Sequence, residues 1–336
     1  MEPVSEKALA LHRRAIVCDS HCDTILALDR QDRRMGERSE VGHSDLPRLL
    51  EGGVTAQVFA LFIEDSYLPG EAVRRTLQLL DVFYREVEAN AESMLLATTA
   101  AGIRRAKAEG KVAAILGIEG GEALEGDIAV LRIFYRLGVR LLTVAWNRRN
   151  ALADGQKESR TGGGLTTFGV EAMQEMNRLG MIVDVSHLSA AGVRDVLEVS
   201  RAPIIASHSN ARAVRDHPRN LSDEQVQAIA GGGGLVAVTF VPFFVAVEGQ
   251  VSLERLLDHV EHLLQVGGED HVGVGSDYDG FGPGIGGSAD QFPELLDVSH
   301  LPRLTEGLLK RGLSERVVEK VLGGNFLRVF EEVAGP

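Results

Sequence analysis

MIVDVSHLSAAGVRDVLEV, residues 181–199, contains one complete unit of the pattern that decides the fold. Its apolar, β-branched start predicts a buried strand that ends near Asp184. Ser189 can then cap an amphipathic helix that runs to Val199. His187 stands between the two elements, so a side chain that can bind a metal or move a proton follows the strand directly.

Similar strand-to-helix units recur along the whole chain. We expect strands to end near Asp19, Leu61, Glu119, Val144, Asp184, Ala206, Thr239 and Gly275. We expect helices at residues 44–51, 71–92, 127–137, 166–179, 189–199, 222–230, 252–266 and 299–311. Eight such repeats predict an α/β protein with a (β/α)8 TIM barrel, a fold whose usual length is ~250 residues.

A doubly wound sheet is the competing architecture, but no glycine fingerprint of the dinucleotide-binding type follows the first strand. No linker or low-complexity segment divides the chain. We therefore expect a single catalytic domain over residues 1–336. A short C-terminal helical extension at 314–322 and a tail should close over the barrel, and residues 36–42 and 282–288 should form irregular loops on the active face.

Composition narrows the class of partner. The 336 residues carry a formal charge of −13, which disfavours nucleic acid and anionic membranes and leaves small molecules and metal ions. Cys18 and Cys22 are too few for a disulfide framework, and the N-terminal residues lack the pattern of a signal peptide. These features predict a cytoplasmic protein that does not associate with membranes.

Ligand-type residues stand at several of the predicted strand ends. His21 and Asp23 lie two apart, so an extended strand would point both to one face. Glu119, His187 and His208 end other strands, and a barrel gathers such ends at one mouth. Three imidazoles and two carboxylates would be a costly cluster without a cation. Five ligands exceed one tetrahedral zinc site and suit two ions that share a bridging carboxylate.

Each of these residues also has a simpler interpretation when taken alone. A histidine at a strand end is commonly a hydrogen-bonded structural residue, and Glu119 could cap the next helix. Asp19 could orient His21 or merely bind backbone amides. We expect Cys18 and Cys22 to be small buried residues. His259 and His262 should lie on the solvated face of an outer helix.

Several segments, taken in order, resemble the renal (membrane) dipeptidases, a family of binuclear zinc peptidases. The similar segments are Asp19-Ser20-His21-Cys22-Asp23, Gly117-Ile118-Glu119-Gly120-Gly121, Asp184-Val185-Ser186-His187, Ala206-Ser207-His208-Ser209-Asn210-Ala211, His217-Pro218-Arg219-Asn220-Leu221, Gly275-Ser276-Asp277-Tyr278-Asp279-Gly280 and Leu322-Gly323-Gly324-Asn325-Phe326. The resemblance runs over nearly the whole chain. It implies a barrel of the metallo-dependent hydrolase type that hydrolyses the peptide bond of dipeptides.

The resemblance also implies roles for individual residues. His21, Asp23 and Glu119 would hold one Zn²⁺, and Glu119, His187 and His208 a second, with a hydroxide between the ions as nucleophile. Asp277 would take a proton from the nucleophile and pass it to the leaving amine. Arg219 would bind the terminal carboxylate of the substrate, and Asn220, in the same motif, would also line the substrate site.

Leu141-Leu142-Thr143-Val144-Ala145-Trp146-Asn147 departs from the family pattern. The mammalian enzymes carry a histidine where this chain has Trp146, and that histidine helps to stabilise the oxyanion. An indole N–H can donate a hydrogen bond but cannot carry a charge. Trp146 is equally consistent with a wall of the substrate pocket or with simple packing.

Several alternatives remain open at this point. The same two ions could hydrolyse another small amide, such as an N-acyl amino acid or a cyclic amide. Trp146 is also consistent with a metal-binding homologue whose catalysis is impaired. Mixed imidazole and carboxylate ligands accept Mn²⁺ or Co²⁺ as well as Zn²⁺. Similarity to the family implies a homodimer.

Overall fold

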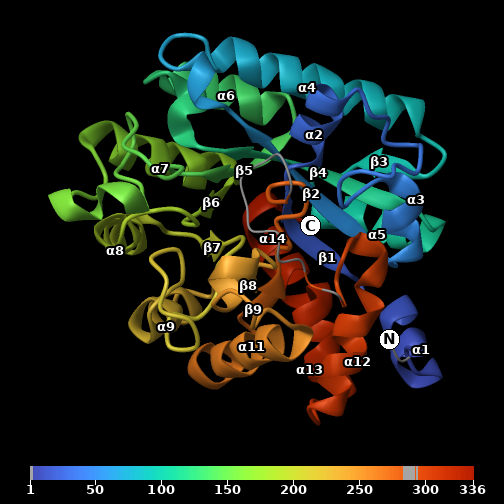
Figure 1. Cartoon of the computed structure of the whole chain (residues 1–336). Coiled ribbons are helices and arrows are strands. Elements are labelled where there is room, and N and C mark those ends of the chain that lie inside the picture. Colours follow the sequence, from blue (N-terminus) through green and yellow to red (C-terminus); the bar gives the residue numbers. More distant parts are fainter. Residues whose placement is uncertain (1–2, 283–291, 293) are drawn as a thin grey trace.

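A computed structural model describes residues 3–282, 292 and 294–336 of the chain. Of the loop expected at residues 282–288, only residue 282 belongs to the described part. The strands are β1 (Cys18–Cys22), β2 (Ala56–Phe62), β3 (Met94–Leu96), β4 (Val112–Glu119), β5 (Val139–Thr143), β6 (Ile182–Asp184), β7 (Ile205–Ala206), β8 (Leu235–Val238) and β9 (Val272–Val274). They lie at the centre of the molecule, with helices around them (Figure 1).

The strands form a closed parallel barrel. Their order is β2-β1-β9-β8-β7-β6-β5-β4-β3, and an additional pairing of β2 with β4 closes a ring of eight. Each of the eight predicted strands corresponds to one strand of this ring, so the predicted (β/α)8 barrel is confirmed. The remaining strand, β3, pairs with β4 at the outer edge, and its three residues are too few to show a periodic pattern.

Helices surround the ring and alternate with its strands. They are α1 (Glu6–Arg14), α2 (Thr24–Gln31), α3 (Leu46–Glu51), α4 (Ala72–Ala89), α5 (Ala100–Glu109), α6 (Ile128–Arg136), α7 (Thr167–Leu179), α8 (Ala190–Val199), α9 (Asp223–Gly231), α10 (Pro242–Val245), α11 (Leu253–Gly267), α12 (Pro302–Lys310), α13 (Glu315–Glu319) and α14 (Asn325–Ala334). The predicted helices correspond to α3, α4, α6–α9, α11 and α12, and the predicted extension to α13. Four helices were not expected from the sequence, namely α1, α2, α5 and α10.

The first strand ends later than predicted, at Cys22 rather than near Asp19. Asp23 is already the N-cap of α2, with φ −98° and ψ 20°. The expected extended His-x-Asp pair is therefore a strand residue followed by a helix cap. Alternation along a strand alone does not explain why both side chains reach the same region.

The C-terminal segment closes the barrel at the end opposite to the candidate site. Phe326, Val329 and Phe330 of α14 pack in one apolar cluster with interior residues such as Val58 and Ile115. The predicted closing tail is therefore a helix. A Cβ on Gly323, which precedes α14, would lie 2.4 Å from the carbonyl oxygen of Ile16, so only glycine fits where this segment passes under β1.

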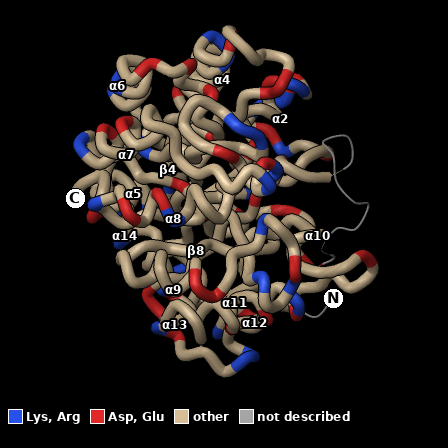
Figure 2. Tube along the Cα trace, turned by 90° about the vertical axis from the view of Figure 1, so that its left-hand side faces the viewer, with Lys and Arg blue, Asp and Glu red and all other residues tan. Residues whose placement is uncertain are grey.

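Charged residues of both signs are interspersed over the outer helices (Figure 2). Within the described residues, no helix is both long enough and apolar enough to cross a bilayer.

Candidate metal centre

Glu119 lies at the centre of the predicted site. It is the last residue of β4, and its side chain is buried at the barrel mouth. One oxygen, Oε2, lies 3.7 Å from Nε2 of His21. The other, Oε1, lies 3.0 Å from Nε2 of His187 and 3.6 Å from Nε2 of His208. The two oxygens therefore face two different groups of ligand atoms, as a bridging carboxylate requires.

The first group comes from β1 and the loop after β9. Nε2 of His21 lies 3.8 Å from Oδ2 of Asp23 and 3.7 Å from Oδ1 of Asp277. In the described part of the chain, neither ring nitrogen of His21 has a hydrogen-bond partner, and neither has Oδ1 of Asp23. Buried polar atoms without partners are rare in folded proteins.

The second group comes from the ends of β6 and β7. Nε2 of His187 and Nε2 of His208 lie 2.8 Å apart. Nδ1 of His187 lies 3.0 Å from Oδ1 of Asn147, and Nδ1 of His208 lies 2.8 Å from Oγ of Ser207. The amide oxygen accepts a hydrogen bond from Nδ1–H of His187, so the Nε2 atom of that ring carries a lone pair.

These atoms fit divalent cations. Ligand atoms of His21, Glu119 and His208 all lie within 4.8 Å of one another, and so do those of His21, Asp23 and Asp277. Acceptor atoms that converge in a buried space repel one another unless a cation lies among them. Imidazole and carboxylate ligands together suit Zn²⁺ and related ions.

The electrostatics of the cluster follow from burial and close carboxylates. Burial raises the pKa of Glu119 well above its usual value, and Asp23 and Asp277 add to this effect. Burial also raises the pKa of Asp277 to about 7, although His21 opposes the shift. For His21, burial lowers the pKa, but Glu119 and the two aspartates outweigh it and raise the value to about 10.

The backbone at the site is held in an unusual conformation. His187 has φ 67° and Asp277 has φ 64°, both in the left-handed region that residues with a Cβ seldom adopt. Gly280 approaches the acidic group closely, because a Cβ there would lie 2.3 Å from Oδ2 of Asp23. Such strain clusters at functional sites, where the surrounding structure compensates for its cost.

A cavity of about 590 Å³ opens over the cluster. Its volume lies within the ~300–1,000 Å³ of small-molecule sites. It is lined by Asp23, Leu26, Arg30, Phe62, Glu119, Trp146, Asn147, Gln156, Lys157, His187, His217, Pro218, Arg219, Val241, Phe243, Phe244, Asp277, Asp279, Gly280 and Phe281. Metal-ligand candidates and a guanidinium group therefore share one space.

Arg219 is the buried cation of this cavity. Its Nη2 donates to the carbonyl oxygen of His208 at 3.1 Å, and its guanidinium carbon lies 5.3 Å from the ring centroid of Phe244. Nε has no partner among the described residues. Burial lowers the pKa of Arg219 to about 10, so the group stays charged at neutral pH. A charged guanidinium group that lines the cavity can bind a carboxylate there.

Trp146 forms part of the cavity wall. Its ring centroid lies 4.9 Å from that of Phe62 and 5.9 Å from that of His187. The ammonium nitrogen of Lys157 lies 5.7 Å from the indole centroid, on the solvent side. These contacts agree with the pocket-wall interpretation of Trp146.

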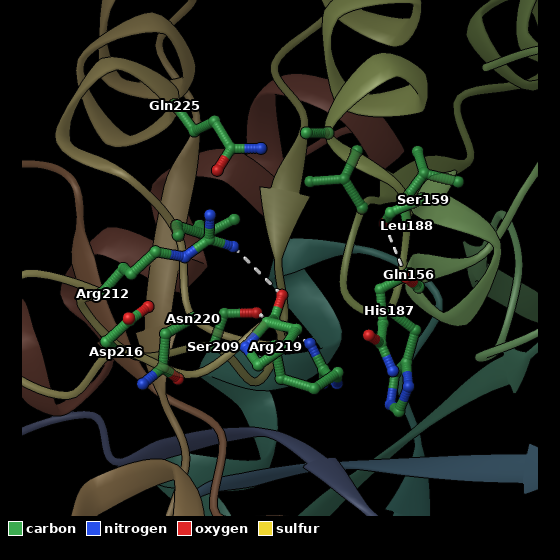
Figure 3. A pocket seen from close by; sticks show the side chains of 14 residues that line it. Gln156, Ser159, His187, Leu188, Ser209, Arg212, Asp216, Arg219, Asn220 and Gln225 are labelled. Carbon is green, nitrogen blue, oxygen red and sulfur yellow. Dashed lines mark hydrogen bonds between the residues drawn. The ribbon is translucent and has the colours of Figure 1, made fainter. Parts of the chain in front are cut away.

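Asn220 does not line this cavity. It lines a neighbouring cavity of about 280 Å³, together with Arg212, Asp216 and Gln225 (Figure 3). Figure 3 also shows His187 and Arg219, which line both cavities. Nδ2 of Asn220 donates to the carbonyl oxygens of Arg215 and Phe244, so its amide joins two loops.

Two further residues, Asp279 and His259, have hydrogen-bond partners outside the cluster of proposed metal ligands. Asp279 belongs to the acidic motif, but its Oδ1 accepts a hydrogen bond from the backbone N–H of His43 at 2.6 Å. His259 was predicted to be solvated, and this prediction was wrong. Its ring is buried, accepts from the N–H of Ala211 at 3.1 Å and donates to the carbonyl oxygen of Val245 at 2.9 Å. Helix α11 faces two active-face segments there, which the helical period cannot reveal.

Sequence reasoning did not assign the groups that hold the histidine rings. Asn147 and Ser207 contact Nδ1 of His187 and His208, and Asp184 contacts Ser207. Each of the three stands at or just after a predicted strand end. That position was the available signal, but a polar side chain there has many other uses.

Comparison with known proteins places this geometry in a family. The family model for membrane dipeptidases, peptidase family M19, matches residues 5–335. Dipeptidase AC, a metallopeptidase of the same family, is 32% identical, with a TM-score of 0.87 over 96% of this chain and 99% of that one. A metallopeptidase from Rhodobacter sphaeroides, liganded with a phosphinate mimic of the dipeptide L-Ala-D-Ala, is 31% identical, with a TM-score of 0.86 over 95% and 99%.

A third similar structure is an amidohydrolase from Pseudomonas aeruginosa, which is 28% identical, with a TM-score of 0.83 over 98% of this chain and 99% of that one. Agreement over whole chains extends the likeness from single motifs to the complete barrel. The family match over residues 5–335 shows that the chain belongs to the membrane dipeptidase family of metallopeptidases.

Proposed function

We propose that this protein hydrolyses the peptide bond of dipeptides with two zinc ions. The ligands of one ion are His21, Asp23 and Glu119, and those of the other are Glu119, His187 and His208. The observation that carries the proposal is the position of Glu119, whose two carboxylate oxygens face separate groups of ligand atoms. When bound, the two metal ions would supply a hydroxide nucleophile at neutral pH and polarise the scissile carbonyl.

Arg219 binds and orients the substrate in this proposal. Its guanidinium group lines the cavity and binds the C-terminal carboxylate of a dipeptide. A fixed carboxylate near the cluster limits the length of peptide that the cavity accommodates. Trp146 forms a wall against the substrate.

Asp277 moves the proton. Its carboxylate lies 3.7 Å from Nε2 of His21, and burial raises its pKa to about 7. A carboxylate at this position can accept a proton from the nucleophile and then donate it to the leaving amine. The leaving amine departs with the proton that the hydroxide nucleophile has lost to Asp277.

A second candidate function is hydrolysis of another small amide, such as an N-acyl amino acid or a cyclic amide. The similar amidohydrolase from Pseudomonas aeruginosa favours it. An N-acyl amino acid also presents a free carboxylate to Arg219. A third candidate is a metal-binding homologue with impaired catalysis, for which the motivation is Trp146.

A metal count followed by a substrate panel tests these functions. Protein purified without added metal is analysed for Zn, Mn and Co, and is then incubated with L,L and L,D dipeptides, including L-Ala-D-Ala. Matched N-acyl amino acids and C-terminally amidated peptides complete the panel. We expect close to two zinc ions per chain and release of free amino acids from dipeptides. Cleavage of N-acyl amino acids alone supports the second candidate, and two bound ions without any turnover support the third.

Three further properties belong to the same proposal. We propose a single-domain enzyme that acts in the cytoplasm as a homodimer. Light scattering at several concentrations measures the mass of the particle, and limited proteolysis reports independent domains. A monomer at all concentrations contradicts the dimer.

A further inference from the structure

Asp184 is the hub of a buried hydrogen-bond network behind the histidine ligands. Its Oδ1 accepts from the backbone N–H groups of Ser186 and Ser207, at 3.0 Å and 2.9 Å. Its Oδ2 accepts from the hydroxyls of Thr143 and Ser207, at 2.6 Å and 2.7 Å. Ser186 and Ser207 directly precede His187 and His208. One carboxylate therefore ties together the ends of β5, β6 and β7.

The network determines where His208 carries its proton. The hydroxyl of Ser207 donates a hydrogen bond to a carboxylate oxygen of Asp184. The oxygen of Ser207 then accepts from Nδ1 of His208, at a distance of 2.8 Å. With the proton on Nδ1, Nε2 presents a lone pair toward Glu119 and His187. This is the tautomer that ligates a metal through Nε2.

A similar aspartate on the other side of the barrel provides an internal comparison. Asp19 accepts from the backbone N–H of His21 at 3.2 Å, and from the N–H and hydroxyl of Ser276 at 2.8 Å and 2.5 Å. Ser276 directly precedes Asp277, just as Ser207 precedes His208. Among the described contacts, however, the Asp19 network bonds no imidazole. The two networks share their architecture and differ in whether they reach a ring.

We propose that Asp184 and Ser207 are positioning residues, which set the tautomer and orientation of His208 so that its Nε2 can bind a metal ion. The proposal rests on the assignment of His208 as a ligand under the proposed function. Neither residue touches the substrate or the ion. Their effect is on metal affinity, and on turnover only through it.

Asp184→Asn tests the direction of the hydrogen bonds with little change of shape. The amide oxygen of the asparagine still accepts the two backbone N–H groups, whereas its NH₂ donates to Ser207. The serine hydroxyl then turns its proton toward Nδ1 of His208, which moves the ring proton to Nε2. We expect the ion that His208 would hold to bind about 10–100-fold less tightly, the usual effect of changing such a partner.

Ser207→Ala removes the relay but leaves the two backbone contacts of Asp184, and Ser276→Ala is its matched control at the Asp19 network. We expect Ser207→Ala to weaken one ion about 10-fold or more. Ser276→Ala should keep the wild-type affinity for both ions, because its hydroxyl reaches no imidazole. The double variant of Asp184 and Ser207 should lose no more affinity than the worse single variant.

Affinities are measured by Co²⁺ and Zn²⁺ titration against a chelating dye, with thermal unfolding as the folding check. Nitrogen NMR of labelled histidine in the metal-free proteins reads the tautomer directly. One ring should change from the Nδ1–H to the Nε2–H form in Asp184→Asn. If wild-type protein fails to bind two ions, the proposed function is wrong. If it binds two ions and Ser207→Ala and Ser276→Ala behave alike, or no ring changes tautomer, the positioning role is wrong.

Discussion

The two halves of the candidate metal centre are built by different means. In the half from β1 and β9, His21 is surrounded by three carboxylates, and its ring nitrogens have no hydrogen-bond partner in the described chain. In the half from β6 and β7, the rings of His187 and His208 are each fixed through Nδ1. The first half supplies negative charge, and the second supplies orientation.

This difference teaches how one site can combine affinity with reactivity. Carboxylates that lie close together attract cations strongly. One of them belongs to Asp277, and burial raises the pKa of this residue to about 7. Rings held by hydrogen bonds lose little rotational freedom when an ion binds. We therefore expect the β6/β7 half to determine where the proposed metal ions bind. We expect the β1/β9 half to determine the proton transfer.

Glu119→Gln should have the largest effect, because Glu119 is the residue that both halves share. A neutral amide has lost the charge that offsets both ions, so we expect less than one ion per chain in place of two. Turnover should fall by about 10⁴-fold or more, since several kcal/mol of transition-state stabilisation come from the metals. Elemental analysis and kcat on the same preparations measure both quantities.

Glu122→Gln is the control for this variant, because Glu122 is partly buried three residues later but does not line the cavity. It should keep both ions and turnover near the wild-type level. Retention of two ions in Glu119→Gln would contradict the bridging position and would separate the two halves into independent sites.

Asp277→Asn should stop proton transfer in the β1/β9 half without removing the metal ion from that half. The three carboxylate and imidazole groups proposed as ligands of that ion remain, so both ions should stay bound. Turnover should fall about 10²–10⁴-fold, the range for loss of a general acid or base. Asp279→Asn is the control on the same loop, because Asp279 contacts the backbone N–H of His43, and its effect should be much smaller. An active Asp277→Asn enzyme would remove Asp277 from the mechanism.

The barrel and the principal site residues could be predicted because each strand is a short apolar run with its polar residue at the end. Glu119, His187 and His208 follow this pattern, and in the structure their side chains converge. Asp23 belongs to the same cluster for a different reason, since it occupies the N-cap position of α2 after the strand has ended. Strand alternation therefore predicted that Asp23 lies near His21, but it wrongly placed Asp23 in the strand.

The contacts that depend on loop packing could not be predicted. Asn220 follows Arg219 directly, yet its amide joins two loops and faces the smaller cavity. His259 lies on an outer helix, yet active-face segments cover its ring. In both cases the position depends on how two loops meet in space. A period of two or 3.6 residues contains no information about that.

Arg219→Ala tests whether the substrate is oriented beside the β6/β7 half, where Arg219 donates to the carbonyl oxygen of His208. We expect kcat/KM for dipeptides with a free carboxylate to fall about 10–100-fold, mainly through KM, because a charged hydrogen bond contributes ~1.5–3 kcal/mol. A C-terminally amidated dipeptide should be affected much less. Arg212→Ala is the control, since Arg212 lines the smaller cavity but not the larger one. Equal losses for the free and amidated peptides would give Arg219 another role.

His259→Gln should have the smallest effect, on the pH dependence of stability rather than on activity. Burial lowers the pKa of His259 to about 4, whereas in the unfolded chain the ring takes up its proton near pH 6.5. The folded protein therefore loses up to about 3 kcal/mol as the pH falls from 6.5 toward 4, and loses nothing through this group above pH 6.5.

The glutamine can keep the hydrogen bonds to Ala211 and Val245 without titrating, so the free energy of unfolding should fall less steeply with acid in that variant. Urea unfolding of metal-free protein between pH 7.5 and 4.5 measures the slope. His262→Gln is the matched substitution on the same helix, where the ring lies partly exposed, 2.8 Å from Asp223. Identical slopes for wild type and His259→Gln would mean that the buried ring accepts its proton in the folded state.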